Sequence, residues 1–253
     1  MNTDRLAAAE LSSWRKSAMV AGVLFLITFV VSIPAQFSFY APVLHDPAYI
    51  IGAGADSSVH WGAFLELLLI IANVGTAVAL FPILKRQNEG LALGYVGARI
   101  IESTFIAIGI LSLLTIVTLR QLSAGTAGAD AAFLVTIGRS LLAIHDWTFL
   151  LGPGFVVGVG NGLILGYLMY RSGLVPRGMA VLGLIGGPLI VASGIAVLLD
   201  VIEPASLPQV VATVPEFFWE LSLGIYLVAK GFNRSAVASL SARAETSGLS
   251  RAA

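Results

Sequence analysis

The sequence has no cysteine and few charged residues. Only 11% of its 253 residues are Asp, Glu, Lys or Arg, whereas a soluble domain is roughly 25% charged. Without cysteine the chain has no disulfides, no thiolate metal ligands and no cysteine nucleophile. Its formal net charge is zero, so no strongly basic surface indicates a nucleic-acid partner. Hydrophobic residues make up 57% and the mean hydropathy is +0.92, which is typical of a multi-pass membrane protein.

Long apolar segments dominate the sequence instead. A helix needs about 20 mainly apolar residues to cross the hydrocarbon core of a bilayer. Six segments reach this length: 18–36, 61–81, 91–119, 147–170, 178–199 and 214–232. None of them alternates with the period of a β-strand. We therefore predict an all-α integral membrane bundle of six transmembrane helices, with the lipid bilayer as its surroundings.

The ends of the chain are predicted to flank this bundle. Arg15 and Lys16 precede the first apolar segment, as in a signal peptide, but the sequence Ile-Pro-Ala at 33–35 is a poor cleavage site, so we expect a retained anchor. The predicted organisation is an N-terminal segment over 1–17, a transmembrane domain over 18–232 and a flexible tail over 233–253. Both end segments are predicted to be cytoplasmic.

The basic residues set this orientation. Eleven of the 14 lie in the two end segments and in the links after the second and fourth spans. The opposite loops hold only Arg120 and Arg139. Because cytoplasmic loops are enriched in Lys and Arg, both termini are predicted to lie in the cytoplasm of a cell whose inner, or plasma, membrane holds the protein. Trp61, Trp147 and Trp219 fall near the predicted outer ends of spans, which is typical of interface anchors.

The fourth span carries two further features. Gly158, Gly162 and Gly166 recur every four residues, which predicts a stripe that packs closely against another helix. Pro153 removes a backbone donor and predicts a kink. The preceding segment 131–144 is helix-prone, but one helix over 131–170 would be about 60 Å long, twice the bilayer core. We therefore expect 131–144 to form an extra outer surface helix before the fourth span.

Polar side chains interrupt the apolar spans. A charged group at the bilayer centre costs about 2.5–3.5 kcal/mol on insertion scales, so each one needs a polar partner or water. Glu216 and Glu220 are four residues apart and share a helix face. The candidates for binding a ligand or carrying a proton are Glu66, Asn73, Arg99, Glu102, Glu216 and Glu220. Their predicted depths place most of them toward the outer half of the membrane.

The carboxylates in this set outnumber the cation. The deep acids Glu66, Glu102 and Glu220 accompany a single arginine, Arg99. Such an excess of negative charge favours a bound proton, a bound cation or a water-filled pocket. One interpretation is an outward-facing acidic pocket for a small molecule, cation or proton. The other is a structural network in which Arg99 pairs with Glu102 and links helices.

Two other functions stay open. His60, His145 and Asp146 lie near predicted outer ends of spans and are candidate metal ligands of an intramembrane metal-dependent hydrolase. The sequence has no His-Glu-x-x-His motif, however, and His60 and Glu66 fall on different helix faces. A non-catalytic partner subunit of another membrane protein is the third hypothesis. No motif identifies a cofactor.

Three sequence stretches resemble a known family. They are "ARIIES" in the third span, "YRSGLVPRGMAVLGLIGG" after the fourth and "PEFFWELSLGIYLVAKGF" in the sixth. Together they resemble the bacterial multi-pass membrane proteins grouped as domain-of-unknown-function family 4386, over about 16–232. The resemblance implies a six-helix bacterial membrane protein and brings no activity with it. The family's recurrent polar positions correspond here to Arg99, Glu102, Glu216 and Glu220.

The predicted orientation has a direct test. Reporter fusions at Asn88, between the second and third spans, and at Ala205, between the fifth and sixth, should report opposite sides of the membrane. The Asn88 fusion should report the cytoplasm. Activity of both reporters on the same side would contradict the topology.

Overall fold

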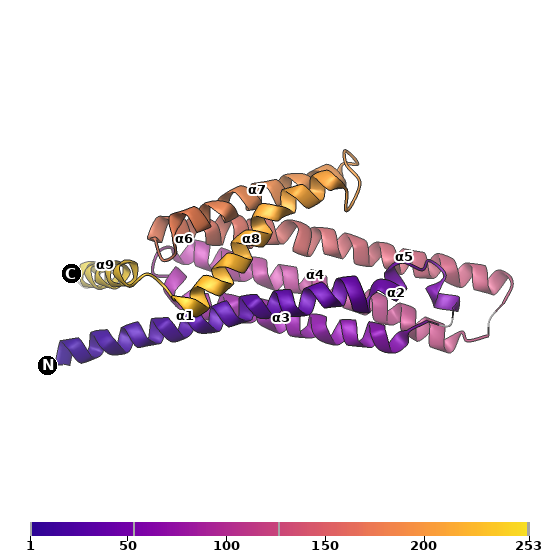
Figure 1. The fold of residues 1–253 in the computed structure, drawn as a ribbon, viewed down its shortest axis with the longest axis horizontal. Coiled ribbons are helices and arrows are strands. Elements are labelled where there is room, and N and C mark those ends of the chain that lie inside the picture. Colours follow the sequence, from indigo (N-terminus) through magenta and orange to yellow (C-terminus); the bar gives the residue numbers. More distant parts are fainter. Residues whose placement is uncertain (1, 53, 126, 252–253) are drawn as a thin grey trace. The chain divides into compact units, whose positions relative to one another are not determined.

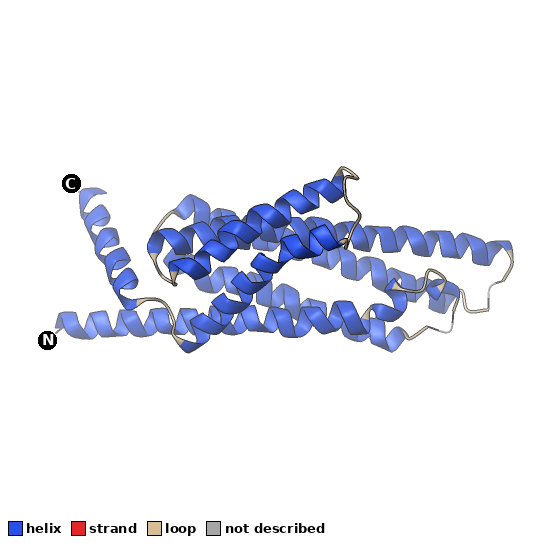
Figure 2. Cartoon of the chain, turned by 45° about the horizontal axis from the view of Figure 1, so that its top comes forward, coloured by secondary structure: helices blue, strands red, loops and turns tan. Residues whose placement is uncertain are grey.

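The computed structural model describes residues 2–52, 54–125 and 127–251. In this part of the chain every regular element is helical, and helices joined by short loops make up the fold (Figure 2). The all-α prediction is therefore confirmed.

Six helical stretches of the described residues are long and apolar enough to cross a membrane: Ser12–Phe39, Asp56–Leu84, Glu89–Leu122, Asp130–Ser172, Arg177–Leu198 and Leu207–Ala229. Each contains or overlaps one predicted span. The elements that build them are α1 (Asn2–Pro34), η1 (Ala35–Phe39), α3 (Asp56–Leu84), α4 (Glu89–Leu122), α5 (Ala129–Leu151), η3 (Gly152–Val156), η4 (Gly158–Leu165), α6 (Gly166–Ser172), α7 (Arg177–Leu198) and α8 (Leu207–Ala229) (Figure 1). The remaining elements are α2 (Ala41–Leu44), η2 (Tyr49–Ile51) and α9 (Arg234–Arg251).

Capping side chains, glycine and proline mark where several of these helices begin and end. The side-chain oxygen of Asn88 accepts the Leu91 backbone N–H at 2.9 Å, which caps the start of α4. Gly173 ends α6 in the left-handed conformation, with φ of 66°, where a side chain would be strained. Pro176 then precedes α7, because its fixed φ suits the entry to a helix.

The segment 131–144 is helical, as predicted. It is the first part of α5, which continues to Leu151 without a break. Past Leu151 the chain enters two π-helical stretches, η3 and η4, before α6. Pro153 lies in η3, at the predicted kink, since its missing N–H breaks the α-helical ladder. The continuity arises because no strong helix breaker separates 131–144 from the span.

The chain divides into two compact units. The first comprises Met1–Leu26, Asn73–Ile100 and Gly154–Ala253, and the second comprises Ile27–Ala72 and Ile101–Pro153. The boundaries fall inside α1, α3 and α4, so each of these helices contributes residues to both units.

Close packing of η4 on α7 organises the first unit. A Cβ added to Gly162 would lie 2.3 Å from the Cα of Gly187, and one added to Gly158 would lie 2.3 Å from Cγ2 of Ile190. Neither Gly158 nor Gly162 can carry a side chain, and at Gly162 and Gly187 the two backbones touch. The predicted glycine stripe is confirmed as a packing surface. Helix α8 packs alongside α7 in the same unit (Figure 1).

The described part of the C-terminal tail contains a helix. It forms α9, and Ala236, Val237 and Leu240 are buried in the core of the first unit. Arg86 donates a hydrogen bond to the Ser241 hydroxyl at 3.0 Å and lies 4.7 Å from the centre of the Trp14 ring. Burial of these three apolar side chains stabilises the start of α9.

In the second unit, an ion pair joins the start of α3 to the end of α4. Asp56, the first residue of α3, pairs with Arg120 in the last turn of α4. The same carboxylate accepts hydrogen bonds from Tyr49 at 2.9 Å and Gln121 at 3.0 Å. Burial raises the pKa of Tyr49, so its hydroxyl stays neutral and remains a donor. The neighbouring Ile50 packs on Gly138 of α5, where an added Cβ would be 3.2 Å from it.

The contact between η4 and α7 generates a stability prediction. Gly187→Ala should lower the free energy of unfolding by about 1–3 kcal/mol, because the new Cβ would lie 2.6 Å from the Gly158 carbonyl oxygen. Gly97→Ala is the matched control, since an added Cβ there meets nothing within 4 Å. Its stability should be unchanged or higher, as alanine favours a helix. Thermal unfolding in detergent measures both variants, and equal destabilisation of the two would contradict the packing role.

Candidate functional site

Two acids and a tryptophan of α8 face the fourth span. Glu216 and Trp219 are buried, and Glu220 is partly buried. The Trp219 indole donates a hydrogen bond to the Asn161 carbonyl at 2.9 Å, and the Asn161 side-chain amide donates one to the Glu220 carboxylate. Asn161 is fully buried in η4 and therefore holds α8 through both its backbone and its side chain. We call Asn161, Glu216, Trp219 and Glu220 the α8 acid site.

The π-helical geometry supports this arrangement. The Asn161 carbonyl accepts the Gly166 N–H five residues on, and also the Trp219 indole. A π-helix has more residues per turn than an α-helix, so the Asn161 side chain points in a different direction from the one that an α-helix would give it. Such π-helical turns are frequent at functional sites. The site therefore depends on the irregular helix that follows Pro153.

Glycines make room for the Glu216 carboxylate. A Cβ added to either Gly162 or Gly186 would lie 2.8 Å from its Oε2 atom. The carboxylate thus sits against the backbones of η4 and α7, where any larger residue would collide with it. A Cβ at Gly183 would likewise lie 2.7 Å from Nε1 of Trp219. The glycines of these two helices create the space that the α8 side chains occupy.

A buried arginine, Arg99, brings a positive charge into the first unit. Arg99 is buried on α4 and donates through Nη2 to the Asn73 side-chain oxygen and through Nε to the Asn73 carbonyl at 3.4 Å. Thr76 donates to the same carbonyl at 2.7 Å. Arg99 also interacts electrostatically with Glu220. Asn73 therefore positions the guanidinium that interacts with Glu220.

The second unit holds a separate polar cluster. The Tyr40 hydroxyl donates to the Glu66 carboxylate at 2.9 Å, and both residues are buried. The buried His145 ring packs edge-on against the Tyr40 ring, with their centres 6.0 Å apart, and interacts electrostatically with Glu66. Gly62 admits the Tyr40 ring, since an added Cβ would lie 2.5 Å from it. We call Tyr40, Glu66 and His145 the Tyr40 cluster.

The predicted set of polar residues falls into two groups. Asn73, Arg99, Glu216 and Glu220 belong to the first unit, whereas Glu66 and Glu102 belong to the second. Glu102 is buried on α4. Each group contains carboxylates in contact with polar partners. That these residues form an outward-facing acidic pocket stays a prediction.

The candidate metal ligands are not brought together. His60 is exposed at the start of α3, and the Asp146 side chain is 71% exposed. Asp146 lies 3.5 Å from Nδ1 of the buried His145, which is a single contact. Among the described residues, no group of three or more His, Asp or Glu side chains is arranged to hold a metal ion. The geometry gives the metal-dependent hydrolase no support.

Three site residues escaped the sequence analysis or were misassigned in it. Trp219 was predicted to anchor the membrane interface but is fully buried, because its indole bonds to η4. Trp61, by contrast, is 58% exposed. Asn161, which lies between two glycines, was not among the predicted site residues, although a lone amide in an apolar span indicates a polar contact inside the membrane. Tyr40 offered no signal, since its partner Glu66 lies 26 residues away.

Six long apolar helices with buried polar clusters define a multi-pass helical membrane protein. The chain belongs to the family described as Domain of unknown function (DUF4386), whose profile matches residues 20–231. The family resemblance of the three sequence stretches is therefore confirmed. Neither a curated protein nor a solved structure matches the chain.

The Tyr40 cluster generates a prediction about stability. Tyr40→Phe removes the hydroxyl that donates to Glu66 and should cost about 1–3 kcal/mol, because a buried carboxylate loses its donor. Tyr167→Phe is the control, since Tyr167 is exposed and its ring remains under Arg171. Thermal unfolding should show a loss only for Tyr40→Phe. An equal melting temperature for Tyr40→Phe and the unaltered protein would count against the cluster.

Proposed function

We propose that the chain binds a proton or a small cation at carboxylates buried in its membrane spans, as a transport or binding protein. The observation that supports this most is the α8 acid site. Glu216 and Glu220, one helical turn apart, both lie against the π-helical η4, with Asn161 in contact with one of them. Paired acids at such a place are costly unless something neutralises them.

The charges of Arg99, Glu216 and Glu220 do not balance, which favours a bound ligand. Arg99 brings one positive charge, and Glu216 and Glu220 bring two negative charges when ionised. A proton or a monovalent cation would balance the remainder. A purely structural ion pair needs only one acid for one arginine, so the second acid favours a bound ligand over a structural role.

The oxygen atoms around Asn161 suit a cation. Its side-chain oxygen is buried and has no hydrogen-bond partner among the described residues. Two carboxylates of α8 are close by, and hard cations prefer carboxylate and amide oxygens. In transporters, irregular helical backbone at membrane depth commonly forms the ion site. The π-helical η4 is irregular backbone of this kind.

The Tyr40 cluster favours the proton among these ligands. A carboxylate, a phenol hydroxyl and an imidazole can all exchange protons, and buried relays in pumps use such groups. His145 also contacts Asp146, whose side chain is largely exposed. These contacts would connect Glu66 with the surface of the second unit. By the distribution of basic residues, that surface is expected to face outward.

The experiment compares three carboxylate variants. Melting temperature in detergent is measured against Na⁺ concentration and against pH for the unaltered protein, Glu220→Gln, Glu216→Gln and the control Glu203→Gln, which alters an exposed acid outside the spans. A ligand of the native state raises the melting temperature as its concentration rises. The response to Na⁺ or to pH should persist in Glu203→Gln and shrink in the α8 variants.

Arg99→Ala separates function from structure. It should destabilise the fold by about 3–5 kcal/mol, because it leaves buried carboxylates without their cation. Glu220→Gln keeps the shape and the contact with Asn161, so it should leave the melting temperature unchanged or higher. If Glu220→Gln unfolds the protein as severely as Arg99→Ala, the acids form a structural network and the proposed function is wrong.

A further inference from the structure

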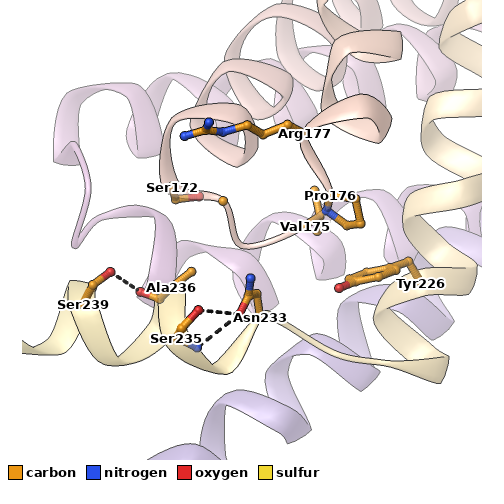
Figure 3. A pocket seen from close by; sticks show the side chains of 10 residues that line it. Ser172, Val175, Pro176, Arg177, Tyr226, Asn233, Ser235, Ala236 and Ser239 are labelled. Carbon is orange, nitrogen blue, oxygen red and sulfur yellow. Dashed lines mark hydrogen bonds between the residues drawn. The ribbon is translucent and has the colours of Figure 1, made fainter.

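A pocket of about 420 Å³ lies where α6 and α8 end and α7 and α9 begin. Its polar lining comes from residues in or beside the α6–α7 and α8–α9 links, as Figure 3 shows: Ser172, Arg177, Tyr226, Asn233, Ser235 and Ser239. The two links are joined by a hydrogen bond from the Asn233 backbone N–H to the Leu174 carbonyl at 2.9 Å. This hydrogen bond fixes the position of the two links that border the pocket.

The lining presents donors and a positive charge. Arg177 lies along one wall, with its guanidinium extending above Ser172 (Figure 3). The Asn233 side-chain oxygen accepts both the backbone N–H and the hydroxyl of Ser235, at 3.1 and 2.9 Å. Its amide nitrogen is therefore the free end and points toward the loop that carries Val175 and Pro176 (Figure 3). The Tyr226 hydroxyl points toward Asn233 from the other side.

The charge around the pocket has one sign. The segments 171–178 and 226–241 contain Arg171, Arg177, Lys230 and Arg234 and no Asp or Glu. Among the described residues that line the pocket there is no Asp or Glu. A guanidinium with amide and hydroxyl donors, and no competing acid, is the chemistry that binds phosphate oxygens.

The position of the pocket relates it to the bilayer. Three membrane-spanning stretches end or begin beside it, at Ser172, Arg177 and Ala229. The pocket therefore lies where spans leave the hydrocarbon core, on the side that the basic residues predict to be cytoplasmic. Anionic phospholipids are enriched in that leaflet, and basic pockets between spans there bind their head groups.

We propose that this pocket binds a phosphate group, carried by an anionic phospholipid or free in solution. Arg177 is the charge partner, and the Asn233 amide and Tyr226 hydroxyl are the further donors. The first turns of α7 and α9 add the positive ends of two helix dipoles. This site is separate from the intramembrane acids and does not depend on them.

The test measures binding of two probes to the purified full chain in detergent. Native mass spectrometry follows phosphatidic acid, with diacylglycerol as the lipid that lacks the phosphate, and a melting-temperature titration follows inorganic phosphate. We expect phosphatidic acid, inorganic phosphate or both to bind, and diacylglycerol not to bind. Saturable binding of phosphatidic acid alone identifies a lipid head group, and binding of inorganic phosphate identifies a soluble phosphate as sufficient. Binding of neither probe, or equal binding of diacylglycerol, overturns the proposal.

Variants then assign the binding to this pocket. Arg177→Gln should weaken the affinity for the bound probe about tenfold or more, because a charge-assisted hydrogen bond is lost. Asn233→Asp keeps the oxygen that caps α9, so the fold should be retained, but it removes the amide donor and repels phosphate. Arg171→Gln is the control, since Arg171 has the same charge, lies beside the same link at the end of α6 and is not among the residues that line the pocket. Equal weakening by Arg171→Gln and Arg177→Gln would mean diffuse attraction and overturns the proposal.

Discussion

The contact between Gly162 and Gly187 is the constraint on which the first unit depends. A Cβ on Gly162 would lie 2.3 Å from the Gly187 Cα, so η4 and α7 meet backbone to backbone. Helices in lipid associate through such close packing, since the hydrophobic effect does not drive them together there. The same contact leaves space for the Glu216 carboxylate beside Gly162 and Gly186. Glycines that bring two helices together thus also admit the acid of a third.

The π-helical segment connects this packing to the polar chemistry. Pro153 interrupts the α-helical ladder, and the irregular helix that follows carries Asn161 inward. The Asn161 amide then contacts Glu220 while its carbonyl holds Trp219. Buried polar groups need partners in a bilayer, and one asparagine serves two side chains of α8. The pocket at the ends of α6 and α8 has a different lining, with Arg177, the Asn233 amide and several hydroxyl groups.

Much of the fold could be predicted because it follows from local composition. The six spans are visible as apolar runs, and the bilayer leaves a helix as the solution for each. The glycine stripe at 158, 162 and 166 was predictable for the same reason, since spacing alone places those residues on one face. The helix over 131–144 was predictable too, but its continuity with the rest of α5 was not, because a helix can extend beyond the bilayer without a break.

The sequence by itself determined which segments cross the membrane, which residues bring charge into them and which face of each helix those residues occupy. Only the tertiary structure decided their partners. Trp219 is buried on Asn161, 58 residues away, and Tyr40 donates to Glu66, which is separated from it in the chain by α2 and η2. Periodicity specifies a direction around one helix axis, whereas a contact also requires the neighbour, its register and the gap between two backbones. Those quantities come from packing of the whole chain, which no short stretch of sequence contains.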